Sequence, residues 1–164
     1  MSAVAPFYLV ADPRLPEHIA AATPASAGWF RSARDTFPEV LRDAGRELEP
    51  FTAGSGWVFN TLDLYLEDRH GFMFGRFGDA ASSDRLSKAR GSYWLALPPA
   101  AAADLLRALE RIDLTLANLV AFITSEHGPD DAAEEATAVE AAMAALKAWL
   151  VQVSPGETGL LSVG

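Results

Sequence analysis

The residues best suited to chemistry in this sequence lie between 60 and 70, in the stretch NTLDLYLEDRH. If the stretch is a helix, Asp63, Glu67 and His70 are spaced i, i+4 and i+7 and share one side with Asn60. Two carboxylates and an imidazole can bind a divalent metal or exchange protons with a substrate. Asp63, Glu67 and His70 are therefore the candidate catalytic or metal-ligating residues, and a solvated helix edge is the alternative interpretation.

Residues 56–75, which must position these side chains, fit two secondary structures. As a strand, Leu62, Leu64 and Leu66 alternate with polar residues, and RHG forms a turn into FMFGRF. As a helix, the apolar residues follow the i, i+3, i+4 pattern and Gly71 takes the left-handed position at the end. We expect the helix, because Leu, Glu and Arg favour it and β-branched residues are few. A hairpin stays open as the alternative.

Other chemical signals in the chain are weaker. The sequence has no cysteine, no phosphate-binding glycine motif and no H-E-x-x-H or G-x-S-x-G motif, and it predicts no cofactor. His70 and His127 each precede a glycine, as residues that interact with the carbonyls at a helix end do. His18 is expected on the surface of a short helix.

Charge is distributed unevenly along the chain. The net charge is −9, and residues 113–164 contribute −7 of it, from 8 acids and the single base Lys147. This disfavours nucleic acid and anionic membranes as partners and favours a basic protein, and ordinary solubility is the alternative interpretation of the negative charge. The candidate partner-binding residues are the acidic cluster, for which helix capping is the alternative role, and an aromatic pair that would be available if exposed. They are Asp130, Asp131, Glu134, Glu135, Trp29 and Phe30.

Composition indicates one globular domain, residues 1–164, in the cytoplasm. Half of the residues are hydrophobic, no apolar run reaches the length of a membrane span, and the N-terminus lacks the basic region of a signal peptide. The absence of cysteine is typical of a reducing compartment. The excess of arginine over lysine and the abundance of alanine are typical of a high-GC bacterial genome.

The predicted fold is α+β: a small mixed sheet with several helices and a C-terminal antiparallel helix pair. We expect strands at 4–10, 92–97 and 158–164, with the last pairing with the other two. We expect helices at 14–21, 24–37, 38–49, within 56–75, at 99–127 and at 130–153, and an extended piece followed by a mobile loop at 72–91. Two apolar stripes define the helix pair: Leu105, Leu109, Ile112, Leu116, Leu119 and Ile123, and Val139, Met143, Leu146, Leu150 and Val153.

The C-terminal half resembles the YfbM-like family of uncharacterised bacterial proteins. The similarity lies in YWLALPPAAAADLLRALERID, in AVEAAMAALKAWLVQV and in TGLLSVG, and TLDLYLEDRHG is similar to that family's Leu- and Asp-rich helix ending in glycine. The family's usual tryptophan in that helix is absent here, where Tyr65 is the nearest aromatic residue. The resemblance implies an α+β fold in a soluble cytoplasmic protein and supplies no catalytic residues.

Three functions remain open from the sequence. The first is a non-enzymatic module that binds another, basic protein, as an immunity or toxin-neutralising protein does. The second is a small metal-dependent or acid–base hydrolase that uses Asp63, Glu67 and His70. The third is a structural subunit that forms a homo-oligomer through Trp29 and Phe30.

Overall fold

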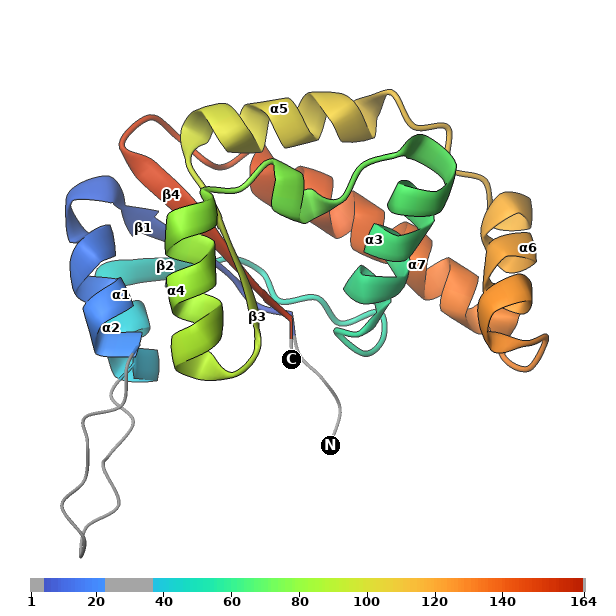
Figure 1. The fold of residues 1–164 in the computed structure, drawn as a ribbon, viewed down its shortest axis with the longest axis horizontal. Helices are drawn as coiled ribbons and strands as arrows, with labels where there is room; N and C mark the ends of the chain where they lie inside the picture. The colour runs from blue at the N-terminus through green and yellow to red at the C-terminus, as the bar shows by residue number, and fades with distance from the viewer. Residues whose placement is uncertain (1–4, 23–36, 164) are drawn as a thin grey trace, which may run out of the picture.

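The computed structural model describes residues 5–22 and 37–163, which form a four-stranded antiparallel sheet with helices on both faces (Figure 1). The strands, in the order β2-β1-β4-β3, are β1 (Phe7–Ala11), β2 (Gly45–Glu47), β3 (Tyr93–Leu97) and β4 (Glu157–Val163). The helices are α1 (Leu15–Ala22), α2 (Phe37–Ala44), α3 (Val58–His70), α4 (Ala80–Arg90), α5 (Pro99–Glu110), α6 (Leu116–His127) and α7 (Ala132–Leu150), with 3-10 turns η1 (Asp12–Arg14) and η2 (Phe74–Arg76). The predicted α+β class is confirmed.

Alternation along the strands separates two cores. Phe7, Leu9, Leu95, Leu97, Leu161 and Val163 face the larger core, which is shared with α3, α5, α6 and α7. Val10, Trp94, Ala96 and Leu160 face a smaller core, shared with α1, α2 and α4. Both faces of the sheet are therefore covered, so strands β1, β3 and β4 carry apolar residues at successive positions.

The predicted strand pairing and the helix within 56–75 are confirmed. β4 lies between β1 and β3, with Leu161 opposite both Phe7 and Leu95. The mixed sheet is corrected, since every described pairing is antiparallel. α3 ends at Gly71, which has a φ of 74° and donates its N–H to the Glu67 carbonyl. The left-handed conformation favours glycine and ends the helix there.

The single helix expected over 99–127 is wrong, because the chain breaks between α5 and α6. α5 ends at Glu110, and Thr115 caps α6 by accepting a hydrogen bond from the Asn118 N–H at 3.3 Å. The apolar spacing continues across the break, but Leu116, expected in the buried stripe, is 43% exposed. The two helices bury their stripes separately, so the spacing alone did not show the change of direction.

Residues 72–91 are also corrected, since the predicted mobile loop contains η2 and α4. Asp79 caps α4 by accepting from the Ser82 N–H at 2.9 Å, and Gly91 ends it with a φ of 65°. Hydrogen bonding to Ser82 lowers the pKa of Asp79. The sequence thus carried an N-cap and a left-handed glycine 12 residues apart, which are ordinary helix signals.

α4 covers the free edge of β3 with serine hydroxyls. The Ser87 hydroxyl accepts from the Trp94 N–H at 2.9 Å and donates to the Trp94 carbonyl at 3.2 Å. Ser83 accepts from the Ala96 N–H at 2.9 Å, and the Asp79 N–H donates to the Ala96 carbonyl at 2.8 Å. Side chains of a helix therefore take the place of a further strand at this edge.

The helix expected over 38–49 is shorter, because its last part is β2. α2 ends at Ala44, and Gly45–Glu47 pair with β1, with Val10 opposite Gly45. A Cβ at residue 45 would lie 2.8 Å from the Leu41 carbonyl oxygen, so glycine is required for the turn from helix to strand. Strand pairing has overridden the helical preference of the segment.

His18, expected on the surface, is fully buried in α1. Its Nδ1 lies 2.6 Å from the Arg14 carbonyl oxygen, one turn earlier in the chain. The helix expected at 24–37 and the candidate pair Trp29 and Phe30 lie outside the described residues, apart from Phe37. Among the described residues, no helix is both long and apolar enough to span a membrane.

Ser87→Ala is expected to lower the free energy of unfolding by about 1–2 kcal/mol, because it leaves the N–H and carbonyl of Trp94 without partners at a partly buried edge. Urea unfolding measures the loss, and hydrogen exchange should show faster exchange of the Trp94 amide. Ser125→Ala, which removes only a hydrogen bond within α6, is the control. Unchanged exchange at Trp94 would show that α4 does not protect the edge.

Candidate functional site

α3 is the element around which the candidate side chains are arranged. It packs against α7 and α6 in the larger core through Phe59, Leu62 and Leu66. Residues at its two ends line separate depressions of the surface, one near Trp57 and the other near His70. The residues predicted at 60–70 are therefore divided between different environments along one helix.

Asp63 is a partly buried carboxyl group of α3 whose pKa is shifted. Its Oδ1 accepts a hydrogen bond from the Phe74 N–H at 2.7 Å, which holds η2 against α3. Burial, together with the charge of Glu67, raises the pKa of Asp63 to about 6, although the bond from Phe74 opposes the shift. Burial and the nearby Asp63 charge also raise the pKa of Tyr93 to about 12. Because its carboxylate accepts the hydrogen bond from Phe74, Asp63 has a structural role in fixing η2.

The predicted set of Asp63, Glu67 and His70 is not brought together as a metal site. Glu67 and His70 are exposed, whereas Asp63 is partly buried beneath η2. Among the described residues, no three His, Asp or Glu side chains are grouped closely enough to hold a metal ion. The shared helical side that the spacing indicated exists, but burial separates its members.

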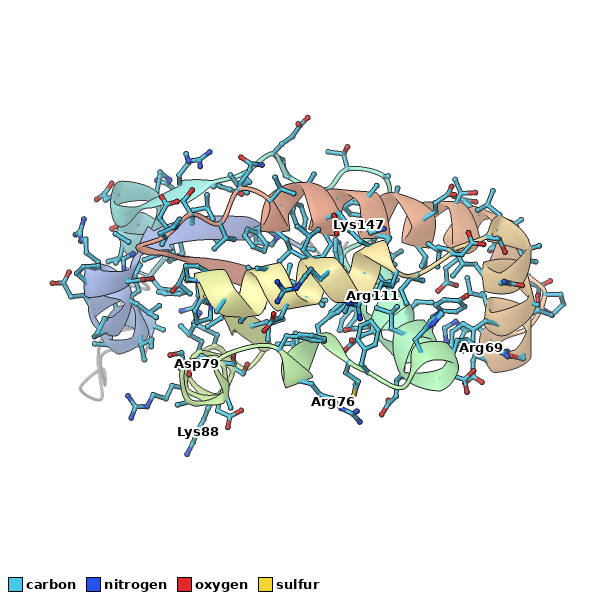
Figure 2. All side chains as sticks on the ribbon, turned by 90° about the horizontal axis from the view of Figure 1, so that it is seen from above. Arg69, Arg76, Asp79, Lys88, Arg111 and Lys147 are labelled. Carbon is cyan, nitrogen blue, oxygen red and sulfur yellow. The ribbon has the colours of Figure 1, made fainter. Side chains whose placement is uncertain are left out.

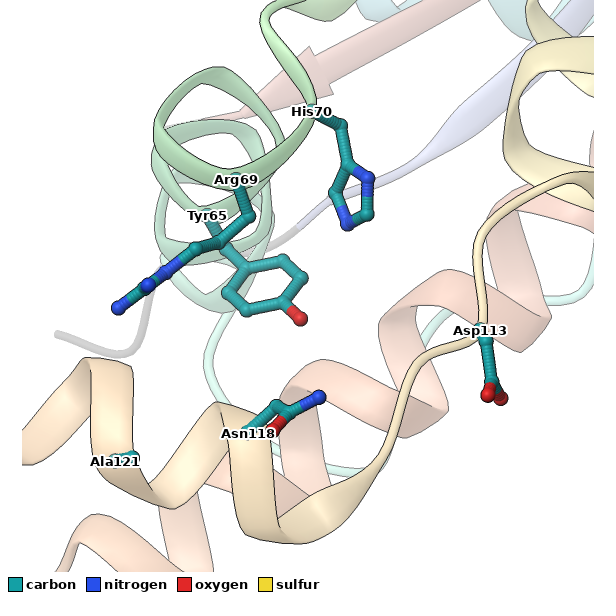
Figure 3. A pocket seen from close by; sticks show the side chains of 6 residues that line it. All are labelled: Tyr65, Arg69, His70, Asp113, Asn118 and Ala121. Atoms are coloured by element: carbon teal, nitrogen blue, oxygen red, sulfur yellow. The ribbon is translucent and has the colours of Figure 1, made fainter.

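His70 lies instead in a depression between α3 and α6, which we call the Tyr65 pocket (Figure 3). Its lining residues are Tyr65, Arg69, His70, Asp113, Asn118 and Ala121, around a cavity of about 280 Å³. The rings of His70 and Tyr65 are 5.7 Å apart. Asp113 belongs to the segment between α5 and α6, so the helix break that the sequence did not indicate supplies one wall of this pocket.

A second depression, which we call the Trp57 groove, lies between the start of α3 and the start of α7. It has a volume of about 350 Å³ and is lined by Ala53, Gly54, Ser55, Trp57, Val58, Thr61, Asp131, Glu134, Glu135 and Ala138. The loop that contains Gly54 lies close against α7. A Cβ added to Gly54, whose φ is 152°, would be only 3.2 Å from the Ala138 Cβ. Three of the predicted partner-binding acids thus line one groove.

Trp57 is the most exposed aromatic side chain described, at 58%. Its backbone is fixed at the start of α3, where its carbonyl accepts hydrogen bonds from the N–H groups of Asn60 and Thr61 at 2.9 and 3.3 Å. Ser, Thr, Asp and Asn are preferred at this capping position, and Trp57 provides no side-chain cap. An exposed indole on a rigid helix start therefore contributes little to the fold.

Glu135 of α7 links the groove to α3 and to the end of α6. Its Oε1 accepts a hydrogen bond from the Thr61 hydroxyl of α3 at 2.7 Å, and its Oε2 lies 3.6 Å from Nδ1 of His127 at the end of α6. Asp131 and Glu134 are exposed and make no such contact among the described residues. Two of the acidic side chains are therefore available to a ligand, while Glu135 holds the groove together.

The acidic cluster does not cap α7 in the expected way. Asp131 occupies the capping position with a φ of 59°, a left-handed conformation, and its side chain accepts no capping hydrogen bond. Glu134 and Glu135 do lie in the first turn, where they interact favourably with the helix dipole. Helix capping by side chains thus explains less of the cluster than the sequence indicated.

Trp57 also lines a third depression on the other side of α3. This region of about 610 Å³ is lined by Trp57, Asn60, Ser87, Gly91, Ser92, Tyr93 and Val163. It carries the aromatic ring of Tyr93, which is 38% exposed, and neutral polar groups. Trp57 therefore stands between an acidic groove and a neutral, partly aromatic one.

Comparison with protein-family models, with curated proteins and with solved structures finds no match to the chain. The YfbM-like resemblance therefore stays a prediction. Trp57 is not among the candidate site residues singled out from the sequence. Its position after GSG, where a helix-capping residue would be expected, was the available signal.

Asp63→Asn is expected to stabilise the protein at neutral pH. The folded-state pKa of Asp63 is raised above the unfolded value of 3.8, so protonation of Asp63 stabilises the folded protein. This stabilisation is complete below pH 3.8 and is lost as the pH rises through about 6. Asparagine is neutral and still accepts from the Phe74 N–H. At about pH 7.5 we expect the free energy of unfolding to rise by about 1–2 kcal/mol, after allowance for the partial exposure of the carboxyl.

Urea unfolding of the two proteins at about pH 4 and about pH 7.5 checks this expectation. The difference in free energy of unfolding between Asp63→Asn and the wild type should be largest at the higher pH and close to zero at the lower one. Asp68→Asn, which changes an exposed carboxylate of the same helix, is the matched control. An Asp63→Asn protein that is less stable than the wild type at both pH values would contradict the assigned cause.

Proposed function

We propose that the protein is a non-enzymatic interaction module that binds a basic segment of another protein in the Trp57 groove. The observation that carries the proposal is the exposed indole of Trp57 beside the free carboxylates of Asp131 and Glu134. A lysine or arginine side chain is attracted to the face of an indole and to carboxylates at the same time. The groove combines both on rigid helix ends.

The composition of the groove supports a basic partner over an acidic or neutral one. None of its lining residues is a lysine, arginine or histidine, and its apolar part consists of Trp57, Val58 and small side chains. The labelled cations Arg76 and Lys88 lie on the opposite side of the molecule from α7, where Lys147 is the single base (Figure 2). A cationic segment approaching the Trp57 groove therefore meets carboxylates and no basic side chain among the lining residues.

The neighbouring depression extends the surface available to such a partner. Because Trp57 lines both regions, a segment can place a basic residue in the Trp57 groove and an apolar or aromatic residue beside Tyr93. Tryptophan and tyrosine are enriched among the residues that dominate binding energy at protein interfaces. The proposal thus assigns Trp57 as the anchor and the acids as the source of selectivity.

We place this interaction in the cytoplasm, on the composition of the sequence. A toxin-neutralising role is one form that binding of a basic protein can take. The hydrolase that uses Asp63, Glu67 and His70 is not preferred, because Asp63 is engaged by Phe74 and the three side chains form no common centre. The homo-oligomer through Trp29 and Phe30 concerns residues outside the described part of the chain.

Trp57→Ala is expected to weaken binding of the basic partner by about 2 kcal/mol, a factor of about 30, because it removes the anchor. Since the side chain is 58% exposed, the free energy of unfolding should change by less than about 0.5 kcal/mol. The partner is first recovered from native-host lysate with the wild-type chain and identified. Its Kd is then measured by calorimetry for wild type and variant.

Matched variants separate the groove from its surroundings. Leu64→Ala removes an exposed apolar side chain of α3 that does not line the groove, and it should leave the Kd unchanged. A partner that binds Trp57→Ala as tightly as wild type would refute the proposed groove, even if that partner is basic.

Glu134→Gln is expected to weaken the same binding by about threefold to tenfold, mainly at low salt. Glu140→Gln, an equal charge change on an exposed position of α7 outside the groove, should have a smaller effect. Binding is compared at about 50 and about 300 mM NaCl, a range over which screening of exposed charges increases strongly. An affinity that is indifferent to salt, with equal effects of both variants, would remove the electrostatic part of the proposal.

A further inference from the structure

We propose that the Tyr65 pocket between α3 and α6 binds a small zwitterion, in which a carboxylate and an ammonium group are separated by a short carbon chain. This site is separate from the Trp57 groove and does not depend on the interaction proposed there. It uses the last turn of α3, the segment between α5 and α6, and the first turns of α6.

The pocket has a rigid floor. Tyr65 is only 2% exposed, and its ring packs edge-on against Phe122 of α6 at 5.4 Å. Figure 3 shows its hydroxyl directed into the pocket, below His70 and facing Asn118. The structure gives this hydroxyl no hydrogen-bond partner among the described residues. A largely buried tyrosine usually bonds through its hydroxyl, so the group is available to a ligand.

Opposite charges lie at the two ends of the pocket. Figure 3 places Arg69 at the end nearer Ala121 and Asp113 at the other end, with Tyr65 between them. Both charges influence the phenol of Tyr65. Burial raises its pKa, Arg69 lowers it and Asp113 raises it. Asp68 pairs with Nε of Arg69 at 2.9 Å, so the two terminal nitrogens of Arg69 remain for a ligand carboxylate. Figure 2 also labels Arg69.

These features select a ligand with both signs of charge. An anion alone is attracted by Arg69 but repelled by Asp113, and a cation alone meets the reverse situation. A zwitterion satisfies both ends, while the Asn118 amide and the Tyr65 hydroxyl provide neutral hydrogen bonds between them. A volume of about 280 Å³ suits a molecule the size of an amino acid.

The test uses 4-aminobutyrate and 6-aminohexanoate as zwitterionic probes, with butyrate and butylamine as probes that carry one charge each. We expect at least one zwitterion to raise the Tm of the full chain by about 3–5 °C at ten times its Kd. Amide NMR shifts should move in residues 65–70 and 113–121. Butyrate and butylamine, alone or mixed, should produce no comparable change.

Two variants locate the binding. Asp113→Asn should weaken binding of the zwitterion at least tenfold, and Tyr65→Phe, which keeps the ring, should weaken it about threefold to tenfold. Asp104→Asn removes an exposed carboxylate of α5 that pairs with Arg107 outside the pocket, and it should have no effect. The proposal is overturned if neither zwitterion shifts the Tm, if butyrate acts as strongly, or if Asp113→Asn binds like wild type.

Discussion

The position of Trp149 is the constraint on which the larger core and the Trp57 groove depend. Its indole stacks with Phe7 of β1 and with Phe59 of α3, at 5.4 and 5.6 Å between ring centroids, and its Nε1 donates to the Glu49 carbonyl at 3.0 Å. One side chain of α7 therefore contacts the sheet, α3 and the loop before α3 together. With that end of α7 fixed, its other end reaches Thr61 through Glu135, and the walls of the groove follow.

The elements predicted correctly are those whose signals are local. α7 combines a regular apolar stripe with Pro155 and Gly156 beyond its end, and Gly71 marks the end of α3. The errors arise where a local pattern has two readings. The apolar spacing across Ile112 and Leu116 is the same in one helix and in two, and only the Thr115 cap distinguishes them. The segment Gly45–Glu47 is a strand because β1 is beside it, which depends on residues far away in the chain.

The candidate sites show the same division between local and distant causes. Helical spacing correctly placed Asp63, Glu67 and His70 along one side of α3, but the burial of Asp63 beneath Phe74 comes from the following segment. The excess of acidic residues directed attention to Asp131, Glu134 and Glu135 as candidate partner-binding residues. It did not indicate that Glu135 is held by Thr61 and His127, or that Trp57 lines the same groove as the two others. Such assignments require knowing which helices are neighbours.

The serines of α4 determine how this protein can meet other chains. Because Ser83 and Ser87 already occupy the outward N–H groups of β3, an incoming peptide finds no free backbone ladder there. The other edge, β2, has only three residues and exposes the charges of Arg46 and Glu47. Recognition by strand addition is thus blocked on one side and poorly supported on the other, which also limits fibril growth by edge-to-edge stacking. At the edges of the described sheet, contacts with other molecules are therefore left mainly to side chains.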